Sequence, residues 1–257
     1  KNIKVNIPLI KNIKTIIKKI LTSWKQNNYS INKNHLNDWW KKINEWKKVD
    51  CLNFSQNGNT IKPQYAVKRL YELTKDINTI ITTEVGQHQM WAAQYYKFEK
   101  PNKWITSGGL GTMGFGFPAA IGAQVANPKA LVVDIAGDGS FSMTENSLAT
   151  AVLEDIPVIV FVLNNSTLGM VAQWQRTFYD RRMIGVDQGG CPDYVKLAES
   201  YGAQGIRAQS MDELDKAIKS ALSSDVATVI DIPIDPEEDV LPFVAPGTSL
   251  ADMILPS

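Results

Sequence analysis

The chain has 257 residues, of which 44% are hydrophobic and 21% charged, a composition typical of globular proteins. No apolar run reaches about 18 residues and lysines interrupt the apolar N-terminal segment, so the sequence predicts neither a membrane-spanning helix nor a signal peptide. The two cysteines, Cys51 and Cys191, are too few for a disulfide framework or a metal cluster, and we expect a cytoplasmic protein.

Charge is unevenly distributed along the chain. Residues 1–50 contain 12 lysines and three acidic residues, although the formal net charge of the whole chain is only +1. A basic arm that binds nucleic acid is one interpretation of this excess. The lysines are spread over helical and loop segments with no arginine among them, so we expect a domain boundary there, and neither a nucleic-acid nor a membrane partner.

The N-terminal segments do not follow the pattern of the rest of the chain. Residues 4–9 predict a short strand, and Asn12 is placed to cap a helix with isoleucines on one face and lysines on the other. We interpret residues 1–22 as the end of a middle domain whose body lies upstream. Residues 23–60, which are polar and rich in Asn, Lys and Trp, are expected to form short helices and a connector.

Residues 61–234 alternate between strand and helix patterns, and residues 235–257 are predicted to form an irregular tail. The strands are apolar on both faces, which predicts an α/β fold with a parallel sheet and helices on both faces. In such sheets ligands bind beyond the carboxyl ends of the strands. Strands are predicted at 79–84, 130–136, 157–163 and 227–232, and helices at 65–73, 118–125, 144–153, 194–201 and 211–222, the last after a capping box of Ser210 and Glu213.

The first motif, Gly137-Asp138-Gly139-Ser140, directly follows a predicted strand. Glycines allow a ligand to approach the backbone closely, and an aspartate at this point is suited to bind a hard cation. Because ordinary turns use the same residues, this motif alone is weak and favours a turn over a binding site.

The second motif is Asn164-Asn165, at the end of the next apolar strand, and Asn165 lies 27 residues after Asp138. That spacing accommodates a crossover helix and a second parallel strand, so both motifs are expected at one edge of the sheet. One carboxylate, one amide oxygen and a nearby carbonyl would leave positions for phosphate oxygens and water on Mg²⁺. The two motifs together therefore predict a magnesium-bridged phosphate site.

This pair of motifs resembles the diphosphate signature of thiamine-diphosphate enzymes. The resemblance implies a thiamine-diphosphate-binding fold in which Asp138, the side chain of Asn165 and the main-chain carbonyl of Thr167 ligate Mg²⁺. It also implies that the glycines of the first motif and Ser140 contact the diphosphate.

Three further segments narrow the resemblance to the catalytic large subunit of acetolactate synthase: residues 84–91 (EVGQHQMW), 108–115 (GGLGTMGF) and 168–174 (LGMVAQW). The resemblance places the cofactor beside Gln87, His88, Gly111, Met113, Gly169 and Met170. It also implies that Met113 lies under the thiazolium ring and bends the cofactor, and that Trp174 lines the pocket of the second substrate and favours 2-oxobutyrate. Met113 and Trp174 would be the catalytic residues that this chain supplies.

The implied activity is decarboxylation of pyruvate and condensation with a second 2-oxo acid, pyruvate or 2-oxobutyrate, in branched-chain amino-acid biosynthesis. The family also implies FAD on the middle domain, a homo-oligomer (dimer or tetramer) with the active site at a subunit interface, and an optional small regulatory subunit. The catalytic glutamate of the family comes from an N-terminal domain, for which we find no candidate segment here. We therefore expect a C-terminal piece, or one half of a split enzyme, that is inactive alone.

Several alternatives remain open at this stage. Another thiamine-dependent enzyme, such as a pyruvate oxidase or a decarboxylase, would share Asp138 and Asn165. A non-catalytic interaction module could keep the fold. A nicotinamide-binding domain is disfavoured because residues 109–114 match the glycine spacing without a convincing acidic partner downstream. The family pattern also fails at residues 246–248 (PGT), which puts the role of the C-terminal tail in doubt.

Overall fold

The computed structural model describes residues 4–189 and 192–256, and Cys191 lies outside this range. The chain divides after Asp50 into two units, which are described separately. No helix among the described residues is long and apolar enough to cross a membrane.

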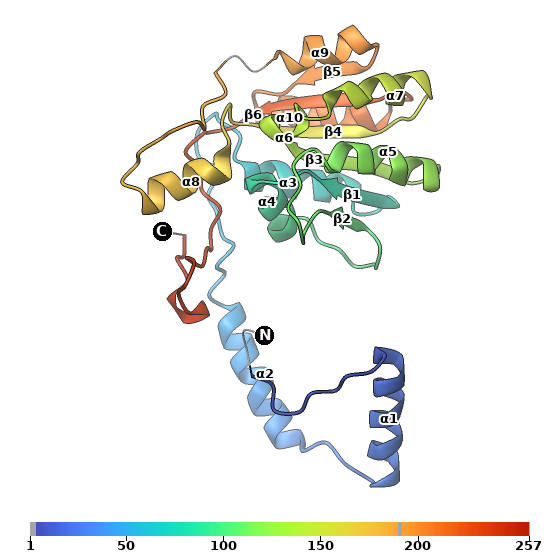
Figure 1. Ribbon diagram of the computed structural model, residues 1–257, viewed down its shortest axis with the longest axis vertical. Coiled ribbons are helices and arrows are strands. Elements are labelled where there is room, and N and C mark those ends of the chain that lie inside the picture. Colours follow the sequence, from blue (N-terminus) through green and yellow to red (C-terminus); the bar gives the residue numbers. More distant parts are fainter. Residues whose placement is uncertain (1–3, 190–191, 257) are drawn as a thin grey trace. The chain divides into compact units, whose positions relative to one another are not determined.

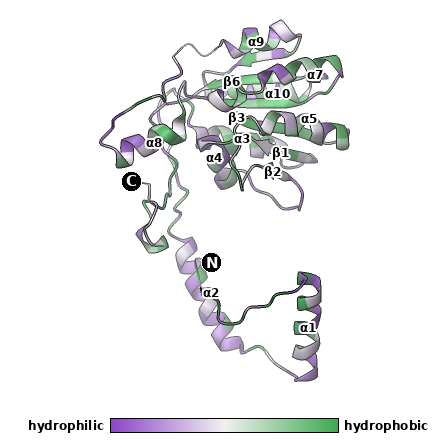
Figure 2. Cartoon of the chain, in the orientation of Figure 1, coloured by the Kyte–Doolittle hydropathy of each residue, from purple (hydrophilic) through white to green (hydrophobic). Residues whose placement is uncertain are grey.

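The first unit consists of two helices, α1 (Ile13–Gln26) and α2 (Lys33–Lys47). The predicted cap is confirmed, since Asn12 Oδ1 accepts a hydrogen bond from the Lys14 amide at 3.0 Å. The strand predicted at residues 4–9 is wrong, because these residues find no strand to pair with. None of the described residues of this unit is buried, and Figure 2 shows apolar and polar residues alternating along α1.

The second unit contains a six-stranded sheet and its flanking helices (Figure 1). Its strands are β1 (Thr79–Thr83), β2 (Trp104–Thr106), β3 (Leu131–Gly137), β4 (Ile159–Asn164), β5 (Gln204–Arg207) and β6 (Thr228–Pro233). Its helices are α3 (Pro63–Thr74), α4 (Gln87–Tyr95), α5 (Gly116–Ala126), α6 (Asp138–Phe141), α7 (Leu148–Leu153), α8 (Gly169–Phe178), α9 (Tyr194–Tyr201) and α10 (Met211–Leu222), with 3₁₀ turns at Glu145–Ser147 and Leu250–Asp252.

All neighbouring strands of the sheet are parallel, in the order β2-β1-β3-β4-β6-β5. The predicted α/β fold with a parallel sheet is thereby confirmed. The four predicted strands are the four central ones, which are buried over almost their whole length. The helix predicted at 144–153 begins as a 3₁₀ turn and becomes α-helical at Leu148.

Two hydrophobic clusters fill the space on either side of the sheet. One cluster joins α3, α4 and α10 to one set of strand side chains, including Ile81, Ile135 and Phe161. The other joins α5, α7 and α9 to the alternate set, including Val132 and Val160. Because successive side chains of a strand point to opposite faces, these apolar strands hold helices on both sides at once.

The carboxyl ends of β1, β3 and β4 meet at one edge of the sheet, because these three strands are neighbours. The register pairs Thr83 with Ile135, and Gly137 with Leu163. The residues that follow the three strands, including Asp138 and Asn165, are thereby brought to the same edge.

Candidate functional site

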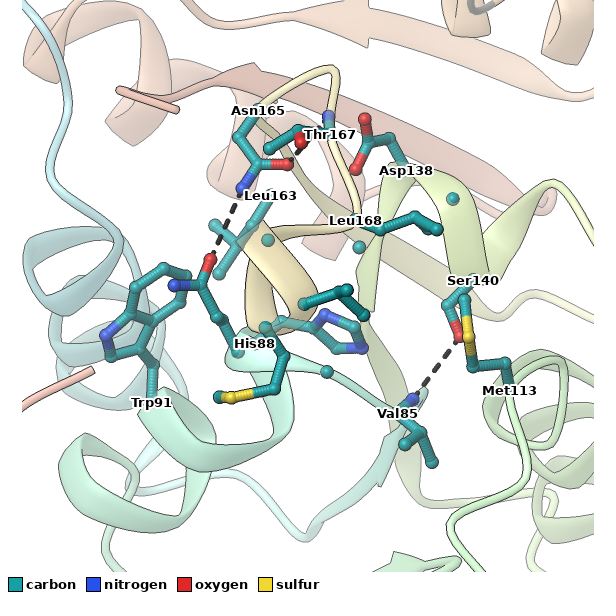
Figure 3. Close-up of a pocket in the computed structure, with 17 residues that line it drawn as sticks. Val85, His88, Trp91, Met113, Asp138, Ser140, Leu163, Asn165, Thr167 and Leu168 are labelled. Atoms are coloured by element: carbon teal, nitrogen blue, oxygen red, sulfur yellow. Dashed lines mark hydrogen bonds between the residues drawn. The ribbon is translucent and has the colours of Figure 1, made fainter. Parts of the chain in front are cut away.

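A pocket opens at this carboxyl edge, with a cavity volume of about 80 Å³ (Figure 3). Its walls come from the segments that follow β1, β3 and β4, from the start of α8, and from Met113. Eleven of the twelve residues predicted to bind the cofactor line it: Gln87, His88, Met113, Gly137, Asp138, Gly139, Ser140, Asn165, Thr167, Gly169 and Met170. The exception is Gly111, which is exposed and outside the lining.

The three predicted metal ligands all line this pocket, and Figure 3 shows Asp138 near Asn165 and Thr167. Asp138 is 1% exposed and Asn165 is 9% exposed. Among the described residues, no group of three His, Cys, Asp or Glu side chains forms a metal cluster. A set with one carboxylate, one amide and one carbonyl therefore suits Mg²⁺, which keeps several water or phosphate ligands, better than a metal held by a protein cage.

The two consecutive asparagines have different surroundings. Asn164 Nδ2 donates to Asp231 Oδ1 at 2.9 Å, and Asn164 Oδ1 accepts from the Ser166 amide at 3.2 Å. Asn165 lines the pocket, and its Oδ1 accepts a hydrogen bond from the Thr167 amide at 3.2 Å. Asn164 therefore stabilises the end of the sheet, while a second lone pair of Asn165 Oδ1 remains for a cation.

A tight turn brings Thr167 back toward Asn165. Ser166 adopts a left-handed conformation with φ of 53°, which non-glycine residues seldom do. Hydrogen bonds from Leu168 N to Val186 O and from Gln188 N to Ser166 O flank the antiparallel bridge of Thr167. In such a bridge the main-chain groups of the middle residue point away from the partner strand, so the Thr167 carbonyl is directed to the side where Asn165 lies.

His88 contributes a buried nitrogen without a hydrogen-bond partner. The residue lines the pocket and is 5% exposed, and its Nε2 is unpaired. Burial lowers the pKa of His88 to about 3, against the opposing effect of a hydrogen bond to the main chain of Glu84. A buried imidazole nitrogen with no partner is costly, which indicates that a polar ligand belongs in this pocket.

Gln87 connects the pocket wall to the C-terminal tail. Its Nε2 donates to Gln173 Oε1 at 2.9 Å and to the Glu238 carbonyl at 3.1 Å. Gln173 in turn exchanges two hydrogen bonds with the main chain of Val240, at 3.1 and 3.0 Å. A Cβ atom on Gly169 would lie 2.0 Å from Gln87 Oε1 and 2.6 Å from Asn165 Nδ2, so a larger residue at this position would displace these two side chains.

Trp174 belongs to a second groove next to the pocket. This groove is lined by Trp174, Tyr179, Arg182 and Ile184, and it shares Met170 with the main pocket. The Trp174 side chain is 37% exposed and packs edge-on against Phe178. The residue predicted to choose the second substrate is therefore adjacent to the pocket but does not line it.

Glu84 lies directly behind the pocket, and the sequence did not reveal its role. It follows β1 directly, is fully buried, and accepts hydrogen bonds from Gly114 N, Phe117 N and Ser140 Oγ. An isolated carboxylate at the end of an apolar strand was the signal that could have identified it, since buried carboxylates need partners.

The fold and the site define a class of protein: an α/β domain that binds a polar ligand at the carboxyl edge of a parallel sheet, between a carboxylate, amides and glycines. Residues 84–232 match the family described as "Thiamine pyrophosphate enzyme, C-terminal TPP binding domain". The chain belongs to this family and is a thiamine-diphosphate-binding domain.

Relatives of similar sequence are acetolactate synthase large subunits. The chain is 42% identical to the probable acetolactate synthase large subunit of Methanococcus aeolicus, over 99% of this chain and 44% of the relative. The values for the acetolactate synthase large subunit of Haemophilus influenzae are the same. The mitochondrial catalytic subunit of Saccharomyces cerevisiae is 45% identical over 84% of this chain. The chain spans less than half the length of these relatives.

Solved structures of similar fold include two decarboxylases. One is the thiamine diphosphate-dependent 4-hydroxybenzoylformate decarboxylase of Rhodococcus jostii, with a TM-score of 0.64, 27% identity, and coverage of 71% of this chain and 34% of that one. The other is benzoylformate decarboxylase from Polynucleobacter necessarius, with a TM-score of 0.66, 26% identity, and coverage of 74% and 36%.

Proposed function

We propose that this chain is the cofactor-binding part of an acetolactate synthase, which joins pyruvate to a second 2-oxo acid, pyruvate or 2-oxobutyrate. The main support is the identity of 42% to acetolactate synthase large subunits over 99% of the chain. The likeness to the two decarboxylase structures is weaker, at 26–27% identity, and it supports a simple 2-oxo-acid decarboxylase as the second candidate.

The residues of the pocket fit a magnesium-bound diphosphate. Asp138, the Asn165 side chain and the Thr167 carbonyl would hold Mg²⁺, and the unpaired Nε2 of His88 would gain a polar partner. A side chain at position 169 would displace Gln87 and Asn165 from the pocket wall. Thiamine diphosphate supplies a nucleophilic carbon that attacks 2-oxo acids and stabilises the negative charge left after loss of carbon dioxide.

The chain's own side chains would position the substrates and the cofactor. Met113, on the opposite side of the pocket from Asn165, would support the ring end, and Met170 would add apolar packing. Trp174 would bound the second-substrate groove. Arg182, which lines that groove, would bind the carboxylate group of the second substrate.

The remaining parts of the enzyme would come from outside this chain. A cavity of about 80 Å³ is smaller than ordinary small-molecule pockets of about 300 Å³ or more, so it accommodates the diphosphate end better than the whole cofactor. We propose that an N-terminal domain of a neighbouring subunit completes the site, that FAD binds a middle domain, and that the 257-residue chain alone binds cofactor weakly and is inactive. Steady release of carbon dioxide from pyruvate by the purified chain would refute this.

The metal assignment is tested by thermal unfolding. Saturating thiamine diphosphate with Mg²⁺ is expected to raise the Tm of the chain by about 5 °C, because a ligand at 100 times its Kd stabilises by about 2.7 kcal/mol. Asp138→Ala should abolish this shift, whereas Asp180→Ala, at an exposed position outside the pocket, should keep it. If Asp138→Ala kept the Tm shift as Asp180→Ala does, the metal assignment would be contradicted.

The reaction is tested in a chimera. This chain would replace the corresponding C-terminal part of the Methanococcus aeolicus relative, so that the other domains are present. Formation of 2-acetolactate from pyruvate supports the synthase. Acetaldehyde as the only product would favour the decarboxylase, and no consumption of pyruvate despite cofactor binding would favour a non-catalytic module.

A further inference from the structure

Glu84 lies behind the pocket wall, not in the pocket. It is 0% exposed, and the pocket lining begins one residue later, at Val85. Its carboxylate accepts three hydrogen bonds in place of contact with solvent. Because all of these bonds are made to the protein, Glu84 is not a substitute for the catalytic glutamate that the family takes from another domain.

Two of the three bonds hold the segment that carries Met113. Oε2 accepts from the Gly114 amide at 2.7 Å, and Oε1 accepts from the Phe117 amide at 3.0 Å. Phe117 is in the first turn of α5, whose N-cap residue makes no side-chain hydrogen bond. Glu84, which follows β1, therefore supplies the acceptors that a helix N-terminus requires.

The third bond ties this segment to Ser140, which follows β3. Ser140 Oγ donates to Glu84 Oε2 at 2.9 Å and accepts from the Val85 amide at 3.3 Å (Figure 3 shows the Val85 bond). The Ser140 hydroxyl proton is thus directed to Glu84 and not toward a ligand. One carboxylate thereby links the Met113 segment to the helix that begins with Asp138.

The backbone next to Met113 is held from both sides. Gly114 has a left-handed φ of 83°, its amide donates to Glu84, and its carbonyl accepts from Thr144 Oγ1 at 3.2 Å. Both oxygens of the Glu84 carboxylate act as acceptors, and burial together with the adjacent Glu84 raises the pKa of Asp134. A charged acceptor makes stronger hydrogen bonds than a neutral one.

We propose that Glu84 is a positioning residue that fixes Met113 at the ring end of the cofactor before the cofactor binds. The role given to Met113 rests on the proposed function, whereas the restraint on residues 113–117 does not. Without Glu84 the diphosphate end of the pocket keeps Asp138, Asn165 and His88, but the support under the ring becomes mobile.

The test compares Glu84→Gln with the wild-type chain and with Thr74→Val, a buried control that loses hydrogen bonds to Leu70 and Tyr96 away from the pocket. Calorimetric titrations in the presence of Mg²⁺ would use thiamine diphosphate and, separately, inorganic pyrophosphate. In Glu84→Gln the Kd for thiamine diphosphate should rise about tenfold or more, as expected for loss of a charge-assisted hydrogen bond, while the Kd for pyrophosphate changes less than about threefold. General destabilisation would raise the Kd of both ligands by the same factor, and an equal rise of the two Kd values overturns the proposal.

Amide hydrogen exchange provides a second test of the restraint on residues 113–117 that does not depend on ligand binding. Glu84→Gln should accelerate amide exchange at residues 113–117 and leave the central strand β4 protected, whereas Thr74→Val should not accelerate exchange at 113–117. If the wild-type chain binds neither ligand, the proposed function fails and the exchange result alone decides the restraint. Should Glu84→Gln not fold, Thr144→Val loosens the same segment from its other side and should show the same effects at smaller size. Unchanged exchange at 113–117 overturns the proposal in either variant.

Discussion

Burial in the pocket controls the ionisation of His88. The imidazole is held neutral because its pKa falls to about 3 from an ordinary value near 6.5. The unfolded chain takes up a proton first as the pH falls, so the stability associated with neutral His88 is present above about pH 6.5 and is lost toward pH 3.

We predict that the free energy of unfolding of the ligand-free chain decreases by about 2–4 kcal/mol between pH 6.5 and 4 because of this residue. His88→Gln should flatten that part of the profile, as measured by urea unfolding at a series of pH values. His35→Gln provides the control, since the other histidine of the chain is exposed on α2. An equal slope in wild type and His88→Gln would contradict the prediction.

Single residues also show where sequence reasoning stops. The positions of Asp138 and Asn165 could be predicted because the ends of parallel strands converge on one edge. The sequence could not assign different roles to Asn164 and Asn165, because that depends on Asp231 reaching Asn164 from the neighbouring strand. Glu84 was hidden for a similar reason, since its partners are two main-chain amides and a hydroxyl that lie 30, 33 and 56 residues away.

Among the elements, α3 and α10 are joined by a two-pronged ion pair on the same face of the sheet. Arg69 Nε and Nη2 donate to the two carboxylate oxygens of Asp215, each at 2.6 Å. The hydrogen bonds to Arg69 lower the pKa of Asp215. Lysine cannot reproduce this parallel geometry, although it keeps the charge.

We therefore predict that Arg69→Lys destabilises the chain by about 1 kcal/mol, which corresponds to a decrease in Tm of about 2–4 °C, as measured by calorimetry. The difference in stability between wild type and Arg69→Lys should be smaller in 0.5 M salt, because the Debye length there is roughly half its value at physiological ionic strength. Arg182→Lys is the matched control, because its pair with Asp180 is exposed and 3.9 Å long. A loss that is the same for both variants would count against the ion pair.

The sequence predicted the central strands, which have long apolar runs, but not the short edge strands or the conformation of the N-terminal segment. The central strands β3 and β4 are apolar on both faces and were found within two residues of their bounds. The edge strands β2 and β5 were missed because they have only three and four residues and are largely half-buried, so no apolar run marks them. The strand expected at residues 4–9 failed for the opposite reason, since an apolar run without a partner strand stays irregular.

For the whole molecule, the buried residues are all in the second unit. The described residues of the first unit, 4–50, include none that is buried, yet they expose large apolar side chains such as Ile13, Trp39 and Trp46. Exposed apolar surface of this kind is a feature of interaction sites and a liability for solubility.

We predict that a truncated chain of residues 51–257 keeps the Tm of the full chain within about 2 °C, because the removed segment buries no core. Binding of the dye ANS, which reports exposed apolar surface, should fall at the same time. The paired variant Trp39→Ser/Trp46→Ser in the full chain should lower ANS binding with no change in Tm. Loss of cooperative unfolding in the truncated chain would show that the first unit supports the sheet.

The hydrogen bonds of Gln87 give the cavity a connection to the far end of the chain. One side-chain amide serves the wall of the cavity, the helix α8 through Gln173, and the carbonyl of Glu238 beyond the last strand. A ligand that accepted a hydrogen bond from the Gln87 amide would either displace the segment around residue 238 or break the bonds to Gln173 and Glu238. A ligand that took the Gln87 amide would therefore compete with the attachment of the C-terminal tail, so that ligand occupancy and tail attachment would be coupled.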